Sequence, residues 1–300
     1  MLHVLLTVAL AAFPSPAPGE WTQGAGGPGK RYAHTLLWDE GAKRAVLFGG
    51  ERNTDDHKPE AILGDLWRYD PAQDAWERVD VKGANPDARA YQAAAIDPAG
   101  RKLYMHGGFD AKFKFRDDLW VLDLDQNTWT ELKPVGDKPG VRDAHSLQFD
   151  EKKKSLYLVG GLLDFADFKS SKETWIFELG SSTWKKGPDA PANVFLHGAI
   201  FDPKERCVLT WGGSDAPDQL VHAWNVDKGV WSRIGSGPPS CMAMGSAFDP
   251  KSRKWYLACG SDGSGCTGSL YAFDLEKKKV EKLASDPRIA RGYTAACLDP

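Results

Sequence analysis

Four arginines of this 300-residue chain stand eight residues before a recurring aspartate, and they are the first candidates for binding chemistry. The recurring aspartates are Asp39, Asp97, Asp150, Asp202, Asp249 and Asp299. The arginines are Arg31, Arg89, Arg142 and Arg291. A guanidinium presents a planar set of donors that matches a carboxylate bidentately, so converging arginines could bind an anionic ligand. The same groups could instead pair with aspartates and backbone carbonyls of the fold itself.

A second set of polar residues stands five residues before four of these aspartates. These residues are His34, Gln92, His145 and His197. One polar side chain on each innermost strand would border the same opening as the arginines, or would form hydrogen bonds within the fold. No nucleophile, Ser-His-Asp set or close-ligand spacing for a metal accompanies them, so neither a catalytic residue nor a cofactor is predicted.

Two segments, residues 109–116 and 162–169, alternate aromatic with charged residues and could form binding loops. The candidates in them are Phe113, Phe115, Arg116, Phe165 and Phe168. Aromatic rings beside cations are common at protein interfaces, although these rings could also fold back onto the protein. The loop from Glu51 to His57 loosely resembles the iron-binding pattern of plant specifier proteins, but its histidine is displaced by two residues, and no metal site is predicted there.

These residues recur because the chain is built from repeats. Each aspartate opens a turn, and ten residues later stands the first residue of a glycine pair at Gly49, Gly107, Gly160 and Gly212, with Cys259 as a degraded equivalent. One strand is expected before the turn, and an apolar strand buried on both faces is expected after it. A third strand of the Leu-Trp-x-Tyr-Asp type follows, then a turn and a tryptophan: Trp76, Trp129, Trp184 or Trp231. The repeat therefore predicts units of four short antiparallel strands.

The paired glycines, the third-strand motif, the later tryptophan and an Arg-x-x-His opening, as at Arg31 to His34, resemble kelch repeats over roughly residues 20–300. The resemblance implies an all-β fold, a β-propeller with blades around a central channel. Five complete blades are expected at about residues 31–79, 89–133, 142–187, 194–234 and 241–283. In kelch proteins, positions equivalent to the arginines often meet anionic peptide or sugar groups at the channel mouth.

An incomplete sixth blade is expected from the two ends of the repeat region, because kelch propellers commonly assemble one blade from both ends. Residues 20–23 would supply its outer strand, and residues 291–298 its inner strand. The resulting 22 strands are two fewer than a six-bladed ring needs. The favoured explanation is that the chain is a fragment of a longer protein, and the alternative is an open ring with exposed strand edges.

The composition fits a globular β domain and excludes some partners. Hydrophobic residues make up 42% of the chain and charged residues 26%, with a net charge of −3. The lysine runs lie at turns beside acidic residues, so no nucleic-acid partner is predicted. The periodic tryptophans and Trp21 are expected to pack between blades, because a buried aromatic ring hides about 150–250 Å² of surface.

Residues 1–11 resemble a secretory signal peptide, with an apolar run, Ala9-Leu10-Ala11 as a cleavage motif, and a linker over residues 12–19. A secreted or periplasmic location is therefore expected, without a membrane span. An exported chain would permit a disulfide between Cys259 and Cys266, which flank a Ser/Gly-rich segment. Cys207 and Cys297 are expected to be small buried hydrophobic residues.

The first functional hypothesis is a monomeric, non-enzymatic binding module that presents the channel mouth to a peptide, protein or glycan. The alternative is a sugar-processing enzyme on the same scaffold, similar to sialic acid epimerases, because Arg and His could hold an anionic sugar. A related oxidase would need a copper site that cannot be assigned here. The third hypothesis is a structural protein with an inert mouth.

Overall fold

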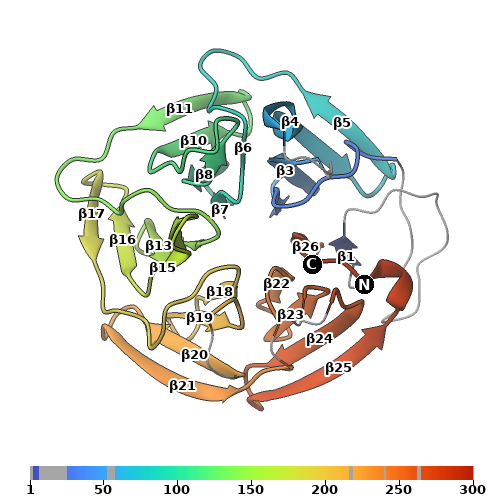
Figure 1. Ribbon diagram of the computed structural model, residues 1–300, viewed down its shortest axis with the longest axis vertical. Coiled ribbons are helices and arrows are strands. Elements are labelled where there is room, and N and C mark those ends of the chain that lie inside the picture. Colours follow the sequence, from blue (N-terminus) through green and yellow to red (C-terminus); the bar gives the residue numbers. More distant parts are fainter. Residues whose placement is uncertain are drawn as a thin grey trace.

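The structure is a computed structural model, and it describes residues 3–6, 26–52, 58–215, 219–239, 241–261 and 265–299. Five four-stranded antiparallel sheets stand around a central axis as the blades of a β-propeller (Figure 1). The predicted all-β fold and its five blades are confirmed.

Each blade runs from an innermost strand at the axis to an outermost strand at the rim, in chain order. Blade 1 holds β2 (Thr35–Asp39), β3 (Arg44–Glu51), β4 (Ile62–Asp70) and β5 (Ala75–Val79). Blade 2 holds β7 (Ala93–Asp97), β8 (Lys102–His106), β10 (Leu119–Asp123) and β11 (Thr128–Leu132). Blade 3 holds β12 (Ser146–Asp150), β13 (Ser155–Val159), β16 (Thr174–Glu178) and β17 (Thr183–Lys186). Blade 4 holds β18 (Gly198–Asp202), β19 (Cys207–Trp211), β20 (Leu220–Asn225) and β21 (Val230–Ser236). Blade 5 holds β22 (Gly245–Asp249), β23 (Lys254–Ala258), β24 (Ser269–Asp274) and β25 (Lys279–Ser285).

Shorter elements lie in the loops. Two small sheets pair β6 (Arg89–Ala90) with β9 (Phe109–Asp110) and β14 (Leu162–Asp164) with β15 (Lys169–Ser170). The 3-10 helices are η1 (Pro59–Ala61) and η2 (Pro287–Ile289). In the described ranges, neither helix is long and apolar enough to cross a bilayer.

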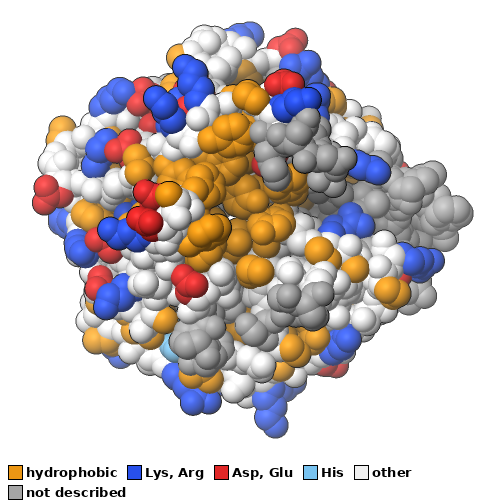
Figure 2. Space-filling view, in the orientation of Figure 1, with side chains coloured by type: hydrophobic (Ala, Val, Ile, Leu, Met, Phe, Trp, Pro, Cys, Tyr) orange, Lys and Arg blue, Asp and Glu red, His pale blue; other side chains and the backbone are white. Residues whose placement is uncertain are grey.

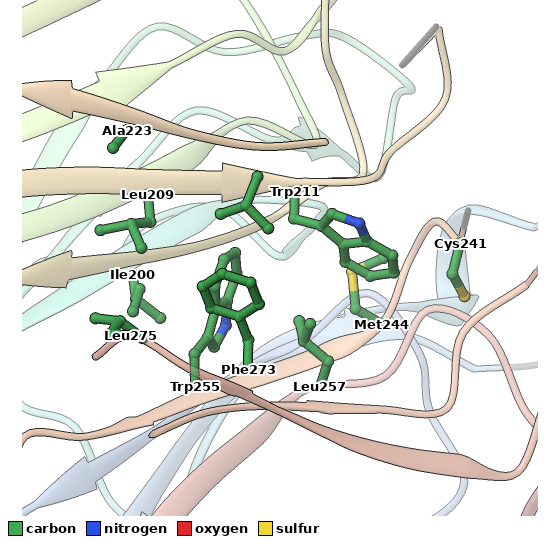
Figure 3. Close-up of a cluster of buried hydrophobic side chains, with 11 residues drawn as sticks. Ile200, Leu209, Trp211, Ala223, Cys241, Met244, Trp255, Leu257, Phe273 and Leu275 are labelled. Atoms are coloured by element: carbon green, nitrogen blue, oxygen red, sulfur yellow. The ribbon is translucent and has the colours of Figure 1, made fainter. Parts of the chain in front are cut away.

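Hydrophobic clusters join consecutive blades. The Trp129 ring of blade 2 lies 5.2 Å from the Phe48 ring of blade 1, and the Trp184 ring of blade 3 lies 5.6 Å from the His106 ring of blade 2. Figure 3 shows the corresponding cluster between blades 4 and 5, where Trp211 and Met244 meet Leu257. The predicted packing of the periodic tryptophans between blades is thus confirmed for Trp129 and Trp184, whereas Trp21 lies outside the described residues.

The recurring aspartates have two structural roles. Within its own hairpin, Asp150 accepts hydrogen bonds from the backbone N–H groups of Lys152 and Lys153. Across to the next blade, Asp150 pairs with Arg206, just as Asp202 pairs with Arg253. Equivalent pairs join Asp39 to Arg101 and Asp97 to Lys154. Asp39, Asp97, Asp150 and Asp202 therefore each close a turn and tie one blade to the following one.

A ring of backbone hydrogen bonds closes the centre of the propeller, which we call the hub. It passes through the residue six positions before each aspartate, and each of these residues has positive φ: Ala33, Tyr91, Ala144, Leu196, Ala243 and Tyr293. The N–H of each except Tyr293 donates to the carbonyl of its predecessor in the ring, as from Ala144 to Tyr91 at 2.9 Å. The ring closes where Thr294 donates to Ala243 and Ala33 donates to Tyr293. Six chain segments therefore surround the axis, although five form complete blades.

The sixth segment ends in β26 (Ala296–Asp299), which lies between blade 5 and blade 1 (Figure 1). It pairs antiparallel with β1 (His3–Leu6). Residues 20–23, expected to form the outer strand of this blade, lie outside the described residues. The composite sixth blade therefore stays a prediction.

The glycine pairs mark the places where blades are closest, and this gives a test of the fold. Gly160 has a φ of +68°, and a Cβ atom there would lie against the Val194 carbonyl oxygen of the next blade. We expect Gly160→Ala to cost at least about 1–2 kcal/mol of unfolding free energy, because an L-residue is strained at positive φ and the carbonyl must also move. Chemical denaturation would measure the loss.

Gly180→Ala is the matched control, because a Cβ atom at Gly180 has nothing within 4 Å and the residue does not have a positive φ. Equal stability of the two variants would contradict the close contact at the glycine pair.

Candidate functional site

Three of the predicted binding arginines are enclosed within their own blades and do not converge on a channel mouth. The Arg89 side chain has no solvent exposure, and its two terminal nitrogens donate to the two Asp118 oxygens at 2.7 and 2.8 Å. Arg31 pairs with Asp65 at 2.6 Å, and Arg142 pairs with Glu173 at 3.0 Å. The expectation that these three face a ligand is corrected by their contacts. Arg291 is half-buried, and its carbonyl accepts from Gly260.

The arginines belong to a repeated buried group of three residues. In blade 2, Arg89 also donates to the Gly107 carbonyl at 3.0 Å, and the Trp120 indole donates to Asp118 at 2.7 Å. Blades 1 and 3 repeat these contacts, with Trp67 on Asp65 and Trp175 on Glu173. The third-strand tryptophan thus stands two residues after an acid because both bind the same arginine-centred group.

The histidines and the glutamine form links between blades. The Gln92 amide donates to the Phe48 carbonyl of blade 1 at 3.0 Å, and the His197 ring lies 3.0 Å from the Ser146 hydroxyl of blade 3. The His145 ring bonds the His106 ring of blade 2 at 3.0 Å. Burial lowers the pKa of His34 to about 3 and of His197 to about 4, so these rings are neutral at pH 7.

A hollow lies at the hub, and the described residues that line it are mainly aromatic and apolar. A cavity of about 340 Å³ is open to solvent on the face that carries the loops after the glycine pairs. Its lining residues are Tyr32, Glu51, Tyr91, Phe109, Phe113, Asp143, Ala144, Leu162, Phe165, Phe168, Phe195, Leu196 and Tyr293. Figure 2 shows hydrophobic side chains gathered around this central hollow, with most Lys and Arg side chains towards the periphery. We call this cavity the hub pocket.

Tyr32, Tyr91, Tyr293, Phe109 and Phe165 form one continuous cluster of rings in the hub pocket. Tyr32, Tyr91 and Tyr293 lie with their ring centres 5.7 to 6.3 Å apart. Tyr91 stacks on Phe109 at 5.4 Å, and Phe109 contacts Phe165 at 5.4 Å. Burial raises the pKa of all three tyrosines, so their hydroxyls stay protonated at neutral pH.

Both predicted binding loops meet at this pocket. Phe113, Phe165 and Phe168 line it, while Phe115 packs on Phe165 with ring centres 4.3 Å apart. Arg116 is not among the lining residues and pairs with Asp87 and Asp110. Four of the seven exposed large hydrophobic residues among the described residues line the pocket: Phe113, Phe165, Phe168 and Tyr293. Such a concentration of exposed rings is typical of a binding surface.

Two carboxylates interrupt the apolar lining. Asp143 is 2% exposed, and among the residues that the structure describes its Oδ1 atom has no hydrogen-bond partner. Burial raises the pKa of Asp143 to about 8. Glu51, also 2% exposed, forms a hydrogen bond with the Tyr32 hydroxyl that raises the tyrosine pKa further.

The spacing of the repeat did not single out the tyrosines and Asp143 that line the hub pocket, because the predictions followed the positions eight and five before each aspartate. The pocket takes hub residues from the positions seven or six before five of the recurring aspartates, as with Asp143 and Tyr91. The residues eight and five positions before the aspartate instead bond within a blade or to the neighbouring blade, as Arg89 and Gln92 do. The adjacency of tyrosine to the arginine motif, as in Arg31-Tyr32, was the available signal.

The sequence also led to expectations about metal ligands, a disulfide and two buried cysteines. In the described part of the chain, no group of three or more His, Cys, Asp or Glu residues could hold a metal ion. Residues 53–57 of the loop after Glu51 lie outside the described residues. Cys259 is buried and Cys266 is exposed, and no disulfide joins these two described residues. Cys297 is buried as expected, whereas Cys207 is half-buried.

Comparison with known proteins agrees with this architecture. The KLHDC2/KLHL20/DRC7 Kelch-repeats domain matches residues 33–193, which is more than half of the chain. Multiple epidermal growth factor-like domains protein 8 of Mus musculus is 30% identical over 221 residues, covering 68% of this chain and 8% of that protein. Acyl-CoA-binding domain-containing protein 4 of Arabidopsis thaliana is 33% identical over 207 residues, covering 68% of this chain and 29% of that protein.

Mei4-dependent protein 6 of Schizosaccharomyces pombe is 29% identical over 165 residues, covering 49% of this chain and 23% of that protein. The chain thus matches less than a third of the length of each of these relatives. Five four-stranded blades, the glycine pairs between them and the family match lead to one conclusion: the chain belongs to the kelch-repeat family.

Proposed function

We propose that this protein is a non-enzymatic binding module that presents the hub pocket and the two loops beside it to a peptide or protein partner. A kelch propeller suggests protein binding, and the observation that supports this site is the concentration of exposed aromatic rings around a concave, solvent-open pocket. Rings of this kind supply most of the contact energy at protein interfaces. A glycan partner is the less favoured ligand.

The sugar-processing alternative drew on arginines and histidines that would face an anionic sugar. Arg31, Arg89 and Arg142 instead pair with carboxylates of their own blades, and no basic residue lines the hub pocket within the described ranges of the chain. We therefore favour a binding function over a catalytic one.

Selection from a displayed library of random peptides would test the binding function. We expect the selected peptides to bind the wild-type protein and to lose at least tenfold in affinity for a Phe165→Ser/Phe168→Ser variant, because each truncated interface ring costs more than about 1.4 kcal/mol. Fluorescence anisotropy would measure the affinities, and circular dichroism would verify folding.

Val230→Ser is the control variant, because Val230 is 52% exposed on the outermost strand β21, away from the pocket. Binders that tolerate the double variant but lose affinity for Val230→Ser would place the interface elsewhere and refute the proposed site.

We also propose that the protein is exported to a secreted or periplasmic location. The support is the signal-like sequence of residues 1–11, with its apolar run and Ala9-Leu10-Ala11 cleavage motif. Mass spectrometry of the mature protein after expression would identify its first residue. A mature protein that begins at Met1 would refute export by cleavage.

A further inference from the structure

We infer that the hub pocket takes the basic side chain of an arginine or lysine presented by a partner peptide, with the side-chain stem between the aromatic rings and its cationic head at Asp143 and Glu51. This inference rests on the proposed binding function. It names the chemistry that the lining residues select.

The charge of the pocket is the first argument. Among the residues that the structure describes, its lining includes two carboxyl groups, Glu51 and Asp143, and no lysine, arginine or histidine. A cation would gain charge-assisted hydrogen bonds from these carboxyl groups in their ionised form.

The orphaned oxygen of Asp143 is the second argument. A buried polar atom without a partner costs free energy, and native proteins seldom retain one without a purpose. Asp143 lines the pocket, its backbone is held by Leu162, and its Oδ1 atom has no partner among the described residues. The neighbouring Arg142 cannot supply that partner, because its guanidinium is held by Glu173 and by the Gly160 carbonyl. A guanidinium or ammonium entering the pocket could donate to this oxygen.

The aromatic lining is the third argument. Cations bind favourably over the faces of Tyr and Phe rings within about 6 Å, and a guanidinium also stacks flat on them. Tyr32, Tyr91 and Tyr293 stand at the hub, and Phe113 and Phe165 stand on the loop side. An arginine or lysine has both an apolar stem for these rings and a cationic head for the carboxyl groups. A purely apolar side chain would leave Asp143 unpaired.

Four short peptides test the inference on the wild-type protein: acetyl-Gly-X-Gly-amide with X as arginine, citrulline, lysine or norleucine. Citrulline has the shape of arginine without its charge, and norleucine has the stem of lysine without its head. Titration by calorimetry or NMR is expected to show at least tenfold tighter binding of each basic peptide than of its neutral counterpart. Equal affinity within each pair, or no binding of any of the four, would overturn the inference.

Two variants locate the effect. Asp143→Asn is expected to weaken arginine-peptide binding at least tenfold and to leave citrulline-peptide binding unchanged. Asp80→Asn, at an exposed residue outside the pocket, should change neither. Unchanged arginine binding by Asp143→Asn would also overturn the inference.

The pH dependence provides an independent readout. The titratable groups around Asp143 in the pocket are Glu51, Tyr32, Tyr91 and Tyr293, and the tyrosines stay neutral below pH 9. Because a cation favours the ionised carboxylate, binding should release a proton from Asp143 below its pKa of about 8. Arginine-peptide affinity is therefore expected to rise by up to about tenfold per pH unit from pH 6 to 8, and to be flatter in Asp143→Asn. Affinity that falls over this range would contradict the inference.

The peptide selection distinguishes failure of the basic-side-chain inference from failure of the proposed binding function. Library-selected peptides that depend on Phe165 and Phe168 but contain no basic residue would preserve the proposed function and refute the basic occupant.

Discussion

Replacing Arg89 with alanine is expected to lower the free energy of unfolding by about 3–5 kcal/mol, because it removes one partner of a buried ion pair and leaves the other. The Arg89 side chain is fully buried, whereas Asp118 keeps only 18% of its side-chain exposure. The change would also leave the Gly107 carbonyl without the guanidinium that now donates to it at 3.0 Å. Urea denaturation followed by tryptophan fluorescence would measure the loss.

The same physics applies at Arg31 and Arg142, which sit in different blades. Their losses should add, because the two sites share no partners. An Arg31→Ala/Arg142→Ala variant is therefore expected to be largely unfolded, since a domain has only about 5–15 kcal/mol of stability. Arg288→Ala is the control, because Arg288 is 85% exposed in its pair with Asp286 and should change stability by less than about 1 kcal/mol. If the double variant is fully folded, these arginines would again be candidates for ligand binding.

Asp143→Asn is expected to stabilise the protein, and by more as the pH rises. The folded state holds the Asp143 proton up to about pH 8, whereas the unfolded chain releases it near pH 4. The unfolded state therefore binds fewer protons between these values, and the stability of the wild type falls by about 1.4 kcal/mol per pH unit from this group. The asparagine amide does not ionise. The unfolding free energy of the variant, relative to that of the wild type, should therefore rise by on the order of 4 kcal/mol between low pH and pH 7.

The measurement is the difference in unfolding free energy between variant and wild type at pH 5, 6, 7 and 8. Taking the difference removes the opposite contribution of the buried histidines, which both proteins share. For example, burial lowers the pKa of His106 to about 3. The contribution of this group therefore lowers the free energy of unfolding as the pH falls below about 6.5. A difference that stays constant with pH would show that Asp143 is not buried as its surroundings indicate.

The sequence was sufficient to predict the strands of each blade, because the contacts that define them lie within single hairpins. Asp150 closes a turn through the N–H groups of Lys152 and Lys153, and the apolar strand Ser155–Val159 is buried at all five residues. These are contacts within one hairpin, so the spacing of aspartate, apolar run and glycine predicts them directly. The inter-blade packing of Trp129 and Trp184 followed from the same period.

The partners of the polar residues were less predictable, because they depend on which neighbour lies across a blade. Arg89 and Asp118 are 29 residues apart, and Gln92 reaches the Phe48 carbonyl 44 residues away. The sequence shows that an arginine recurs. It does not show whether a carboxylate of the same blade or an arriving ligand will occupy that arginine.

By itself, the sequence determined that this chain folds into kelch blades, that aromatic loops follow the glycine pairs, and that polar residues recur near the hub. Only the tertiary structure decided which residues face the opening. The residue six before each aspartate adopts positive φ in the closed hydrogen-bonded ring, as Tyr91 and Ala144 do. That local reversal sends Arg89 and Arg142 into the blades and leaves Tyr91 and Asp143 at the pocket, because a left-handed residue breaks the alternation on which strand-based reading depends.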